Sequence, residues 1–252
     1  MFDLTGHTAL ITGGGSGLGA AIAHGLAAQG AAVVLADLSA ENLRNTRDQL
    51  IQTGYDEAAV ETVELDVTDR GQVSRVVDEL ARRHDGVEIL INSAGVVFLD
   101  PVESITDEHW DTTLAVNLSG SFAVARAVAA PMREAGYGRI ITIASQAAHA
   151  ALEHHAAYAA SKTGLFGLTG ALARELGPHG VTANTISPTV VMTELGRRAW
   201  DGPHGEAHKA EIPARRFAEP KEIAAAAVYL ASREAAMVNG ADLRVDGGFT
   251  IV

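Results

Sequence analysis

The chain has no cysteine among its 252 residues. Disulfide bonds, thiolate nucleophiles and cysteine-ligated zinc sites are therefore excluded, and any redox chemistry would need a diffusible cofactor. Aromatic residues make up only 5% of the sequence, whereas 26 glycines and a hydrophobic fraction of 47% suit a sheet packed closely against helices. The same hydrophobic fraction is enough to bury a core, which excludes a disordered chain.

Basic residues are also scarce. Nineteen Lys and Arg residues stand against 31 Asp and Glu residues, which gives a formal net charge of −12. Phosphate backbones and anionic lipid surfaces would repel such a chain, so we expect neither a nucleic-acid partner nor a membrane partner. The first residues lack the basic and apolar regions of a secretory signal, and no apolar run approaches the roughly 20 residues of a membrane span. We therefore expect a cytoplasmic protein.

Short apolar segments with strand character alternate with segments of helical periodicity along the whole chain. The strand-like segments are 8–11, 32–36, 60–65, 89–91, 139–143, 182–186 and 242–245. The helix-like segments are 17–29, 40–53, 69–84, 107–134, 157–176 and 220–231. This alternation predicts a single α/β domain over residues 1–252, with a doubly wound parallel sheet and helices on both faces. The irregular stretch at about 188–213, called the substrate loop below, is longer than an ordinary connection and is expected to hold substrate determinants.

A glycine-rich turn follows the first predicted strand directly. Glycines at 13, 17 and 19 permit a tight turn and let backbone amides approach a pyrophosphate at the start of the next helix. Such a turn can also serve only to connect two elements of secondary structure, but its place between a strand and a helix favours a dinucleotide site. The residues predicted to bind the cofactor here are Gly13, Ser16, Gly17, Leu18 and Gly19.

A carboxylate, Asp37, ends the second predicted strand, where an adenosine ribose would lie. It should accept hydrogen bonds from both ribose hydroxyls and repel a 2′-phosphate, and the neighbouring Leu38 supplies no compensating cation. The sequence therefore predicts NAD rather than NADP, in contact with Asp37 and Leu38. The alternative interpretation of Asp37 is a helix cap.

Two further predicted strands end at the same carboxyl edge, where α/β sheets bind their ligands. After the first, Asp66 and Val67 are candidate cofactor contacts; Asp66 could receive an adenine amino group, although a helix cap explains it nearly as well. After the second, small residues permit close approach to a bound ribose. The predicted contacts there are Asn92, Ser93, Ala94 and Gly95.

A phenol and an ammonium lie one helical turn apart, at Tyr158 and Lys162. An adjacent ammonium favours the phenolate, so Tyr158 could remove a hydroxyl proton near neutral pH. Ser145 follows a predicted strand on the carboxyl edge and could hold the substrate oxygen beside Tyr158. The sequence thus predicts a proton-transfer site, although the spacing of Tyr158 and Lys162 alone is a weak signal.

The ordered set of these motifs resembles the short-chain dehydrogenase/reductase family: the turn at 12–19, the segment 92–95, Asn117, Ser145, Tyr158 and Lys162. The resemblance covers essentially the whole chain. It implies a Rossmann fold, a homotetramer and Tyr158 as the acid/base, with Ser145 orienting the alcohol. It also implies that Lys162 lowers the tyrosine pKa and binds the nicotinamide ribose, and that Asn117 holds a proton-relay water. From the residues alone, Asn117 would be interpreted as a helix break or cap.

Two positions depart from the usual family pattern: Ser93 replaces a second Asn, and Thr189 replaces the Gly that commonly follows Pro188. Neither belongs to the predicted catalytic residues Asn117, Ser145, Tyr158 and Lys162, but each bears on a local backbone bond or on the nicotinamide pocket. In the substrate loop the resemblance implies cofactor contacts by Pro188, Val191 and Thr193.

Several segments, among them 144–147, 186–190 and 193–196, are similar to bacterial polyol dehydrogenases of the glycerol/1,2-diol, D-threitol and galactitol type. This similarity implies a small-molecule polyol or ketose as substrate, and such a pocket needs several hydrogen-bonding groups. The predicted substrate contacts are Ser145, Gln146, His155 and Tyr158. The galactitol type also suggests a structural magnesium near the C-terminus, but nothing local indicates its ligands and no metal site is predicted.

Other functions explain the residues less well. A Ser-His-Asp hydrolase could pair Ser145 with His149 or His155, but the Gly-x-Ser-x-Gly motif is missing and Tyr158 would have no role. The adjacent residues 153–155 could suggest a metal, but a polar loop explains them better. A non-catalytic dinucleotide sensor would have lost its proton-transfer residues. The main alternative is an NAD(P)H-dependent ketone reductase of the 3-oxoacyl-thioester or steroid type, against which Asp37 counts.

Overall fold

A computed structural model of the chain describes residues 1–84 and 86–251. Within these residues seven strands form one parallel sheet in the order β3-β2-β1-β4-β5-β6-β7. The strands are β1 (Thr8–Thr12), β2 (Ala32–Asp37), β3 (Val60–Glu64), β4 (Ile89–Asn92), β5 (Gly138–Ile143), β6 (Val181–Pro188) and β7 (Asp242–Val245). The strand order reverses between β1 and β4, and the crevice at such a switch point is where doubly wound sheets bind ligands.

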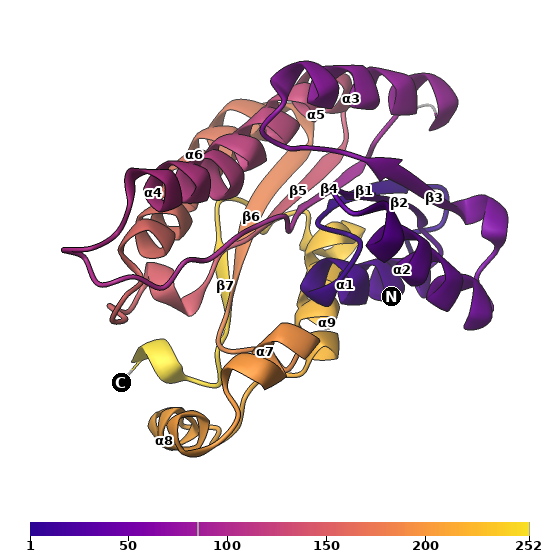
Figure 1. Cartoon of the computed structure of the whole chain (residues 1–252). Coiled ribbons are helices and arrows are strands. Elements are labelled where there is room, and N and C mark those ends of the chain that lie inside the picture. The colour runs from indigo at the N-terminus through magenta and orange to yellow at the C-terminus, as the bar shows by residue number, and fades with distance from the viewer. Residues whose placement is uncertain (85, 252) are drawn as a thin grey trace.

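Helices cover both faces of this sheet (Figure 1). One face carries α1 (Gly17–Ala27), α2 (Ala40–Gln52) and α9 (Pro220–Ala231). The other carries α3 (Arg70–His84), α5 (Ser121–Ala135) and α6 (Ala156–Leu176), and α4 (Asp107–Leu114) packs against α6. The predicted Rossmann-type α/β fold, with its strands and its helices on both faces, is thus confirmed.

The two hydrophobic layers share the strands between them. In β1, Ala9 and Ile11 point toward α1 and α9, whereas Leu10 points toward α3 and α5. This alternation follows from the two-residue period of side chains along a strand. Nearly continuous apolar strands are therefore needed, because both faces of the sheet are buried.

Two segments differ from the expectation. The predicted helix 107–134 is divided by a π-helical turn, η2 (Ala115–Gly120), between α4 and α5. The substrate loop, expected to be irregular, contains the short helices α7 (Glu194–Ala199) and α8 (Pro203–Glu211), which lie beyond the sheet near the C-terminus (Figure 1). Their lengths of 6 and 9 residues are too short for helical periodicity to indicate them reliably.

Residues Asp107–Ala135 form a stretch of 29 residues that is long and apolar enough, by length and composition alone, to cross a membrane. The sequence-based expectation missed this, because polar residues interrupt the apolar run. In the structure Val124, Val128 and Met132 of this stretch are buried against the sheet and α3. Its apolar character is thus partly that of a core helix.

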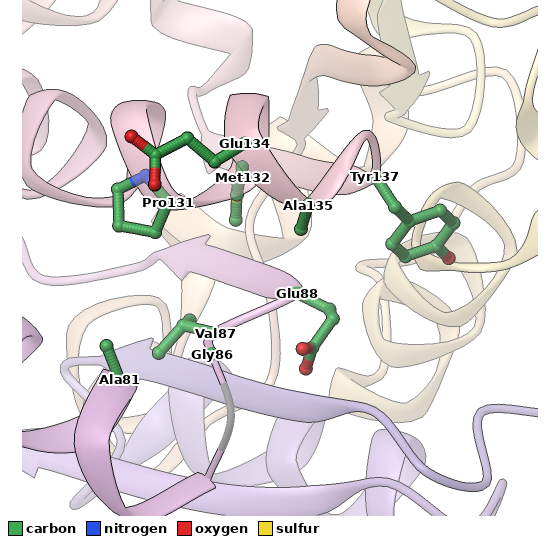
Figure 2. A pocket seen from close by; sticks show the side chains of 9 residues that line it. All are labelled: Ala81, Gly86, Val87, Glu88, Pro131, Met132, Glu134, Ala135 and Tyr137. Atoms are coloured by element: carbon green, nitrogen blue, oxygen red, sulfur yellow. The ribbon is translucent and has the colours of Figure 1, made fainter.

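A cavity of about 250 Å³ lies among residues that precede β4 and β5 (Figure 2). Gly86, Val87 and Glu88 line it before β4, and Ala135 and Tyr137 line it before β5. Since the strands are parallel, this is the amino edge of the sheet. Ser145 follows the carboxyl end of β5, so this cavity lies at the opposite edge of the sheet from the predicted catalytic serine.

Candidate active site

The glycine turn is packed so closely that side chains would not fit at several of its positions. Gly13 has a φ of +67°, and a Cβ on it would lie 2.9 Å from the Cα of Ala94. A Cβ on Gly19 would lie 2.1 Å from the carbonyl oxygen of Gly13.

Helix α1 begins at Gly17, so its first amide groups lie beside the glycine turn, and Leu18 lies in the first turn of the helix. Ser16 occupies the N-cap without a side-chain capping bond among the described residues. A narrow cradle of backbone amides of this kind fits a pyrophosphate.

Asp37 lies beside this turn, at the end of β2. Its Oδ2 accepts the Gly15 N–H at 3.1 Å and its Oδ1 accepts the Ser39 N–H at 3.1 Å. The cap of α2 is Ser39, whose hydroxyl accepts the Asn42 N–H, so the alternative interpretation of Asp37 as a helix cap is wrong. The carboxylate is therefore held in a fixed position next to the glycines, with the exposed Leu38 following it.

Asp66 closes a turn with Thr68. Its Oδ1 accepts hydrogen bonds from the Thr68 N–H at 2.8 Å and the Thr68 hydroxyl at 2.7 Å. Asp69 instead accepts the Gly71 and Gln72 N–H groups in the first turn of α3. The cap is again a neighbouring residue and not the candidate itself. Val67 is buried against Gly120 of η2, where a Cβ would lie 2.6 Å from its Cγ2. This contact joins the end of β3 to the element that carries Asn117.

The segment after β4 is attached to β1 through a residue that the sequence did not single out. The hydroxyl of Thr12 accepts the Ser93 N–H at 3.1 Å and the Ala94 N–H at 3.2 Å. The unusual Ser93 therefore keeps an ordinary backbone hydrogen bond. The buried Asn92 side chain donates inward, to the Ser121 carbonyl and the Thr142 hydroxyl. Its amide thus links β4 to α5 and β5, a structural role besides the predicted cofactor contact.

Asn117 lies fully buried in the π-helical turn, a feature that often marks functional sites. Its Oδ1 accepts the Val96 N–H at 2.8 Å, and its Nδ2 donates to the Val96 carbonyl at 2.9 Å and to the Ser161 hydroxyl at 3.1 Å. Ser161 in turn donates to the Tyr158 carbonyl at 2.7 Å. Both amide hydrogens of Asn117 are committed, so its side chain positions the segment at Val96 beside α6. The relay water stays a prediction.

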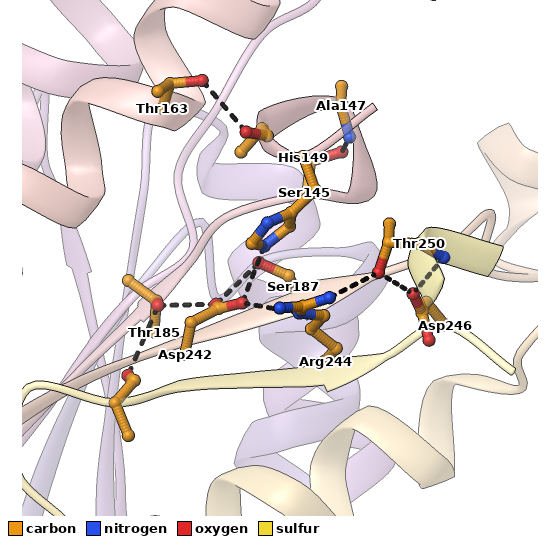
Figure 3. Close-up of polar contacts among 12 residues, drawn as sticks. Ser145, Ala147, His149, Thr163, Thr185, Ser187, Asp242, Arg244, Asp246 and Thr250 are labelled. Carbon is orange, nitrogen blue, oxygen red and sulfur yellow. Dashed lines mark hydrogen bonds and ion pairs between the residues drawn. The ribbon is translucent and has the colours of Figure 1, made fainter. Parts of the chain in front are cut away.

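Ser145, Tyr158 and Lys162 meet at the carboxyl end of β5. The hydroxyl of Ser145 accepts the Ala147 N–H at 3.1 Å, which caps a short 3₁₀ turn (Figure 3). Lys162 is buried, and its Nζ donates to the Ile143 carbonyl at 2.8 Å and lies 5.6 Å from the centroid of the Tyr158 ring. A Cβ on Gly95 would lie 3.6 Å from the same Nζ, so the segment after β4 adjoins this cluster.

Burial dominates the ionisation of this cluster. It raises the pKa of Tyr158 above its usual value, partly offset by a hydrogen bond with the Ser145 side chain. Burial also lowers the pKa of Lys162 to about 8. Burial is thus the larger effect on Tyr158 within the described chain, because desolvation disfavours both charged forms while the ammonium of Lys162 bonds to the Ile143 carbonyl. The lowering of the Tyr158 pKa by Lys162 stays a prediction.

The predicted substrate contacts adjoin this cluster. The ring of His155 lies edge-on to Tyr158, with 6.0 Å between the ring centroids, and its Nδ1 lies 2.6 Å from the Glu153 carbonyl oxygen. Gln146 is only 3% exposed, and its Nε2 lies 3.2 Å from Nε2 of His208 on α8. His208 had not been singled out, because contact across 62 residues leaves no local signal in the sequence.

The substrate loop reaches the cofactor half of the molecule. Pro188 ends β6, and Val191 forms a β-bridge with Ala218. Thr193 caps α7, and a Cβ on Gly17 would lie 3.8 Å from the Thr193 methyl group. The substrate loop therefore adjoins the glycine turn at Thr193, and the cofactor contacts of Pro188, Val191 and Thr193 stay predictions.

A polar network links the Ser145 turn to the last strand (Figure 3). Asp242 Oδ2 lies 2.8 Å from Nε2 of His149, while Asp242 Oδ1 accepts the hydroxyls of Thr185 at 2.6 Å and Ser187 at 2.7 Å. Within the described residues, neither His149 nor His155 is hydrogen-bonded to Ser145. The geometry thus gives no support to a Ser-His-Asp hydrolase.

Comparison with known proteins agrees with this architecture. The family model described as enoyl-(acyl carrier protein) reductase matches residues 13–250. The chain is 52% identical over 250 residues to a D-threitol dehydrogenase of Mycolicibacterium smegmatis (99% of this chain, 95% of the relative). It is 40% identical over 250 residues to an NAD-dependent glycerol dehydrogenase of Listeria innocua (99% and 96%).

A crystal structure of a gluconate 5-dehydrogenase from Burkholderia cenocepacia, in complex with NADP and tartrate, superposes with a TM-score of 0.94 at 35% identity, covering 100% of this chain and 98% of that one. Similarity of this extent covers the glycine turn, the catalytic cluster and the substrate loop alike. The chain belongs to the short-chain dehydrogenase/reductase family.

Proposed function

We propose that this protein is an NAD-dependent dehydrogenase that interconverts a secondary alcohol of a small polyol or diol and the corresponding ketone. The observation that carries the proposal is the meeting of Ser145, Tyr158 and Lys162 at the carboxyl end of β5, beside the glycine cradle. The 52% identity to a D-threitol dehydrogenase and the 40% identity to a glycerol dehydrogenase support the polyol class of substrate.

Each residue of the cluster has a distinct role in this proposal. Ser145 orients the substrate oxygen, and Tyr158 takes the hydroxyl proton as the carbinol carbon is oxidised. Lys162 holds the ribose next to the nicotinamide. Asn117 and Ser161 fix the segment at Val96 relative to α6, and the substrate binds between this segment and the helix. When bound, the nicotinamide dinucleotide supplies the hydride acceptor.

The preference for NAD rests on Asp37. Its carboxylate is held by the Gly15 and Ser39 amides. In this position it can accept hydrogen bonds from the ribose hydroxyls and repel a 2′-phosphate. The relative from Listeria innocua is NAD-dependent, whereas the gluconate 5-dehydrogenase structure holds NADP. The other proposed cofactor contacts are those of the glycine turn, the segment 92–95, Asp66, Val67 and the substrate loop.

A cytoplasmic homotetramer is also proposed. Trp110 of α4 and Phe122 of α5 are each 38% exposed, and partly exposed aromatic residues on neighbouring helices suit an interface between copies. Light scattering coupled to size-exclusion chromatography measures the mass directly, and a monomer would contradict this part of the proposal.

The test measures reduction of NAD and of NADP through the absorbance of the reduced nicotinamide. The substrates are glycerol, 1,2-propanediol, D-threitol, arabinitol, sorbitol and galactitol. We expect turnover with NAD on one or a few of these polyols and its loss in Tyr158→Phe. No turnover on any polyol, combined with reduction of a 3-oxoacyl thioester or a steroid ketone, would favour the ketone reductase. Cofactor binding without any turnover would favour the dinucleotide sensor.

A further inference from the structure

We propose that His208 is a positioning residue that fixes the amide of Gln146, so that the Gln146 carbonyl oxygen accepts a hydrogen bond from a hydroxyl next to the reacting carbinol. The ligand class is therefore the vicinal diol. This inference rests on the proposed alcohol oxidation and deepens it, because it assigns a specific protein atom to the second hydroxyl of the substrate.

The pair joins the substrate loop to the catalytic turn. Gln146 directly follows Ser145 and is 3% exposed, while His208 lies on α8 and is 7% exposed. Their Nε2 atoms are 3.2 Å apart. Two nitrogens share a hydrogen bond only if one of them accepts, and an amide nitrogen does not accept, so the imidazole is the acceptor.

Glu211 favours this tautomer of His208. Its Oε2 lies 3.3 Å from Nδ1 of the His208 ring, and a carboxylate accepts hydrogen bonds. The proton of a neutral imidazole therefore sits on Nδ1 and leaves Nε2 free to accept the Gln146 amide. As a result, His208 of the substrate loop determines which end of the Gln146 amide faces the imidazole.

The other end of the Gln146 amide is buried without a partner. Its Oε1 has no hydrogen bond with any residue in the described ranges 1–84 and 86–251. Burying a carbonyl oxygen without a donor costs free energy, so a position of this kind next to the catalytic serine suits a donor brought by the ligand. When the reacting oxygen lies at Ser145, a hydroxyl on the adjacent carbon is such a donor.

The imidazole has little freedom to turn away. Trp200 stacks on it with 4.8 Å between ring centroids, and Phe249 meets it edge-on at 5.0 Å. A Cβ on Gly205 would lie 1.9 Å from the Trp200 carbonyl oxygen, so α8 packs directly on the chain before it. This close packing holds His208, and through it Gln146, in a single orientation.

The experiment compares 2,3-butanediol with 2-butanol, which differ only in the neighbouring hydroxyl. The measured quantity is the ratio of kcat/KM for the diol to kcat/KM for the alcohol. In His208→Phe, which keeps an aromatic ring but loses the acceptor, we expect this ratio to fall about tenfold or more. His208→Gln, whose amide oxygen can approach the position of Nε2, should restore part of it.

His204→Phe is the matched control. His204 also lies on α8 and stacks on Trp200, at 4.7 Å, but it is exposed and is not hydrogen-bonded to Gln146 in the described structure. Its diol-to-alcohol ratio should equal that of the wild type. Glu211→Ala, at an exposed position where folding is not at risk, should lower the ratio in the same direction by a smaller factor.

Equal losses on both substrates in His208→Phe would mean that His208 only stabilises the loop, and would overturn the inference. An unchanged ratio in both His208→Phe and Glu211→Ala would overturn it as well, while leaving the proposed function intact. If the wild type oxidises neither substrate nor any polyol, the proposed function fails and the inference fails with it. Circular dichroism and NAD-dependent thermal shifts verify the folding of each variant.

Discussion

The ammonium of Lys162 donates a 2.8 Å hydrogen bond to the carbonyl oxygen of Ile143. This bond ties the second turn of α6 to the end of β5, two residues before Ser145. Tyr158 lies one turn earlier on the same helix, so a single contact sets the separation between the proposed base and the serine that orients its substrate. Lys162 is thus part of the geometry of the site as well as of its charge.

Lys162→Met should abolish activity and yet stabilise the fold. Burial lowers the pKa of Lys162 to about 8 from 10.5, which corresponds to a cost of about 3 kcal/mol for holding the buried charge at neutral pH. Methionine has a similar shape and no charge, although it loses the bond to Ile143. We expect turnover to fall at least ~100-fold and the urea midpoint at pH 7 to rise.

The same group gives stability a definite pH dependence. Because the folded pKa of Lys162 is lowered, the unfolded chain binds more protons than the folded chain between about pH 8 and 10.5. The contribution of Lys162 therefore becomes less unfavourable as the pH rises through this window. The stability advantage of Lys162→Met should shrink from pH 8 to pH 10, and a constant difference would contradict the lowered pKa.

Tyr158→Phe should reduce kcat by about 10²- to 10⁴-fold and leave the affinity for NAD nearly unchanged. Burial raises the pKa of Tyr158, so the phenolate that acts as base becomes more abundant as the pH rises from neutral. We therefore expect alcohol oxidation by the wild type to accelerate with pH up to about 10. Steady-state rates across this range test both points, and full activity of the variant would exclude Tyr158 as the base.

Asp37→Ala should weaken the discrimination between NAD and NADP. The variant loses the acceptor for the ribose hydroxyls and the repulsion of a 2′-phosphate, so kcat/KM with NAD should fall about tenfold or more relative to kcat/KM with NADP. Adding Leu38→Arg, at an exposed neighbouring position, should raise the use of NADP further. Unaltered discrimination in Asp37→Ala would show that another group excludes the phosphate.

Asp242→Ala should destabilise the protein by about 2 to 3 kcal/mol, because it leaves the hydroxyls of Thr185 and Ser187 and the ring of His149 without their common partner. Urea denaturation measures the free energy of unfolding. Asp48→Ala, on the exposed side of α2, is the control and should change it by less than about 0.5 kcal/mol. Equal stability of the two variants would mean that the network contributes little.

The strands and the glycine turn were predictable because local signals determine them. Apolar runs of four to eight residues mark buried strands, and Gly13 and Gly19 stand where backbone meets backbone. Thr12, Ser161 and His208 were not predictable, because their roles depend on contacts across 44 to 82 residues. The π-helical turn at Asn117 was missed for a related reason, since helical periodicity does not distinguish it from α-helix.

The raised pKa of Tyr158 was not predictable, because the sequence shows the spacing of Tyr158 and Lys162 but not their burial. A charge one turn away favours the phenolate, whereas desolvation disfavours it, and only the folded environment decides which effect is larger. The alternative interpretation of Asp37 as a helix cap was wrong by two residues, because Ser39 caps α2.

The alternation of Ala9, Leu10 and Ile11 between the two hydrophobic layers has a consequence for how the molecule comes apart. If the helices on one face detached, the same strands would expose the side chains of that face to water, and the layer on the other face would lose the packed sheet beneath it. The glycine turn and the catalytic cluster should therefore unfold together, in one cooperative transition. Loss of activity on heating should then coincide with loss of secondary structure.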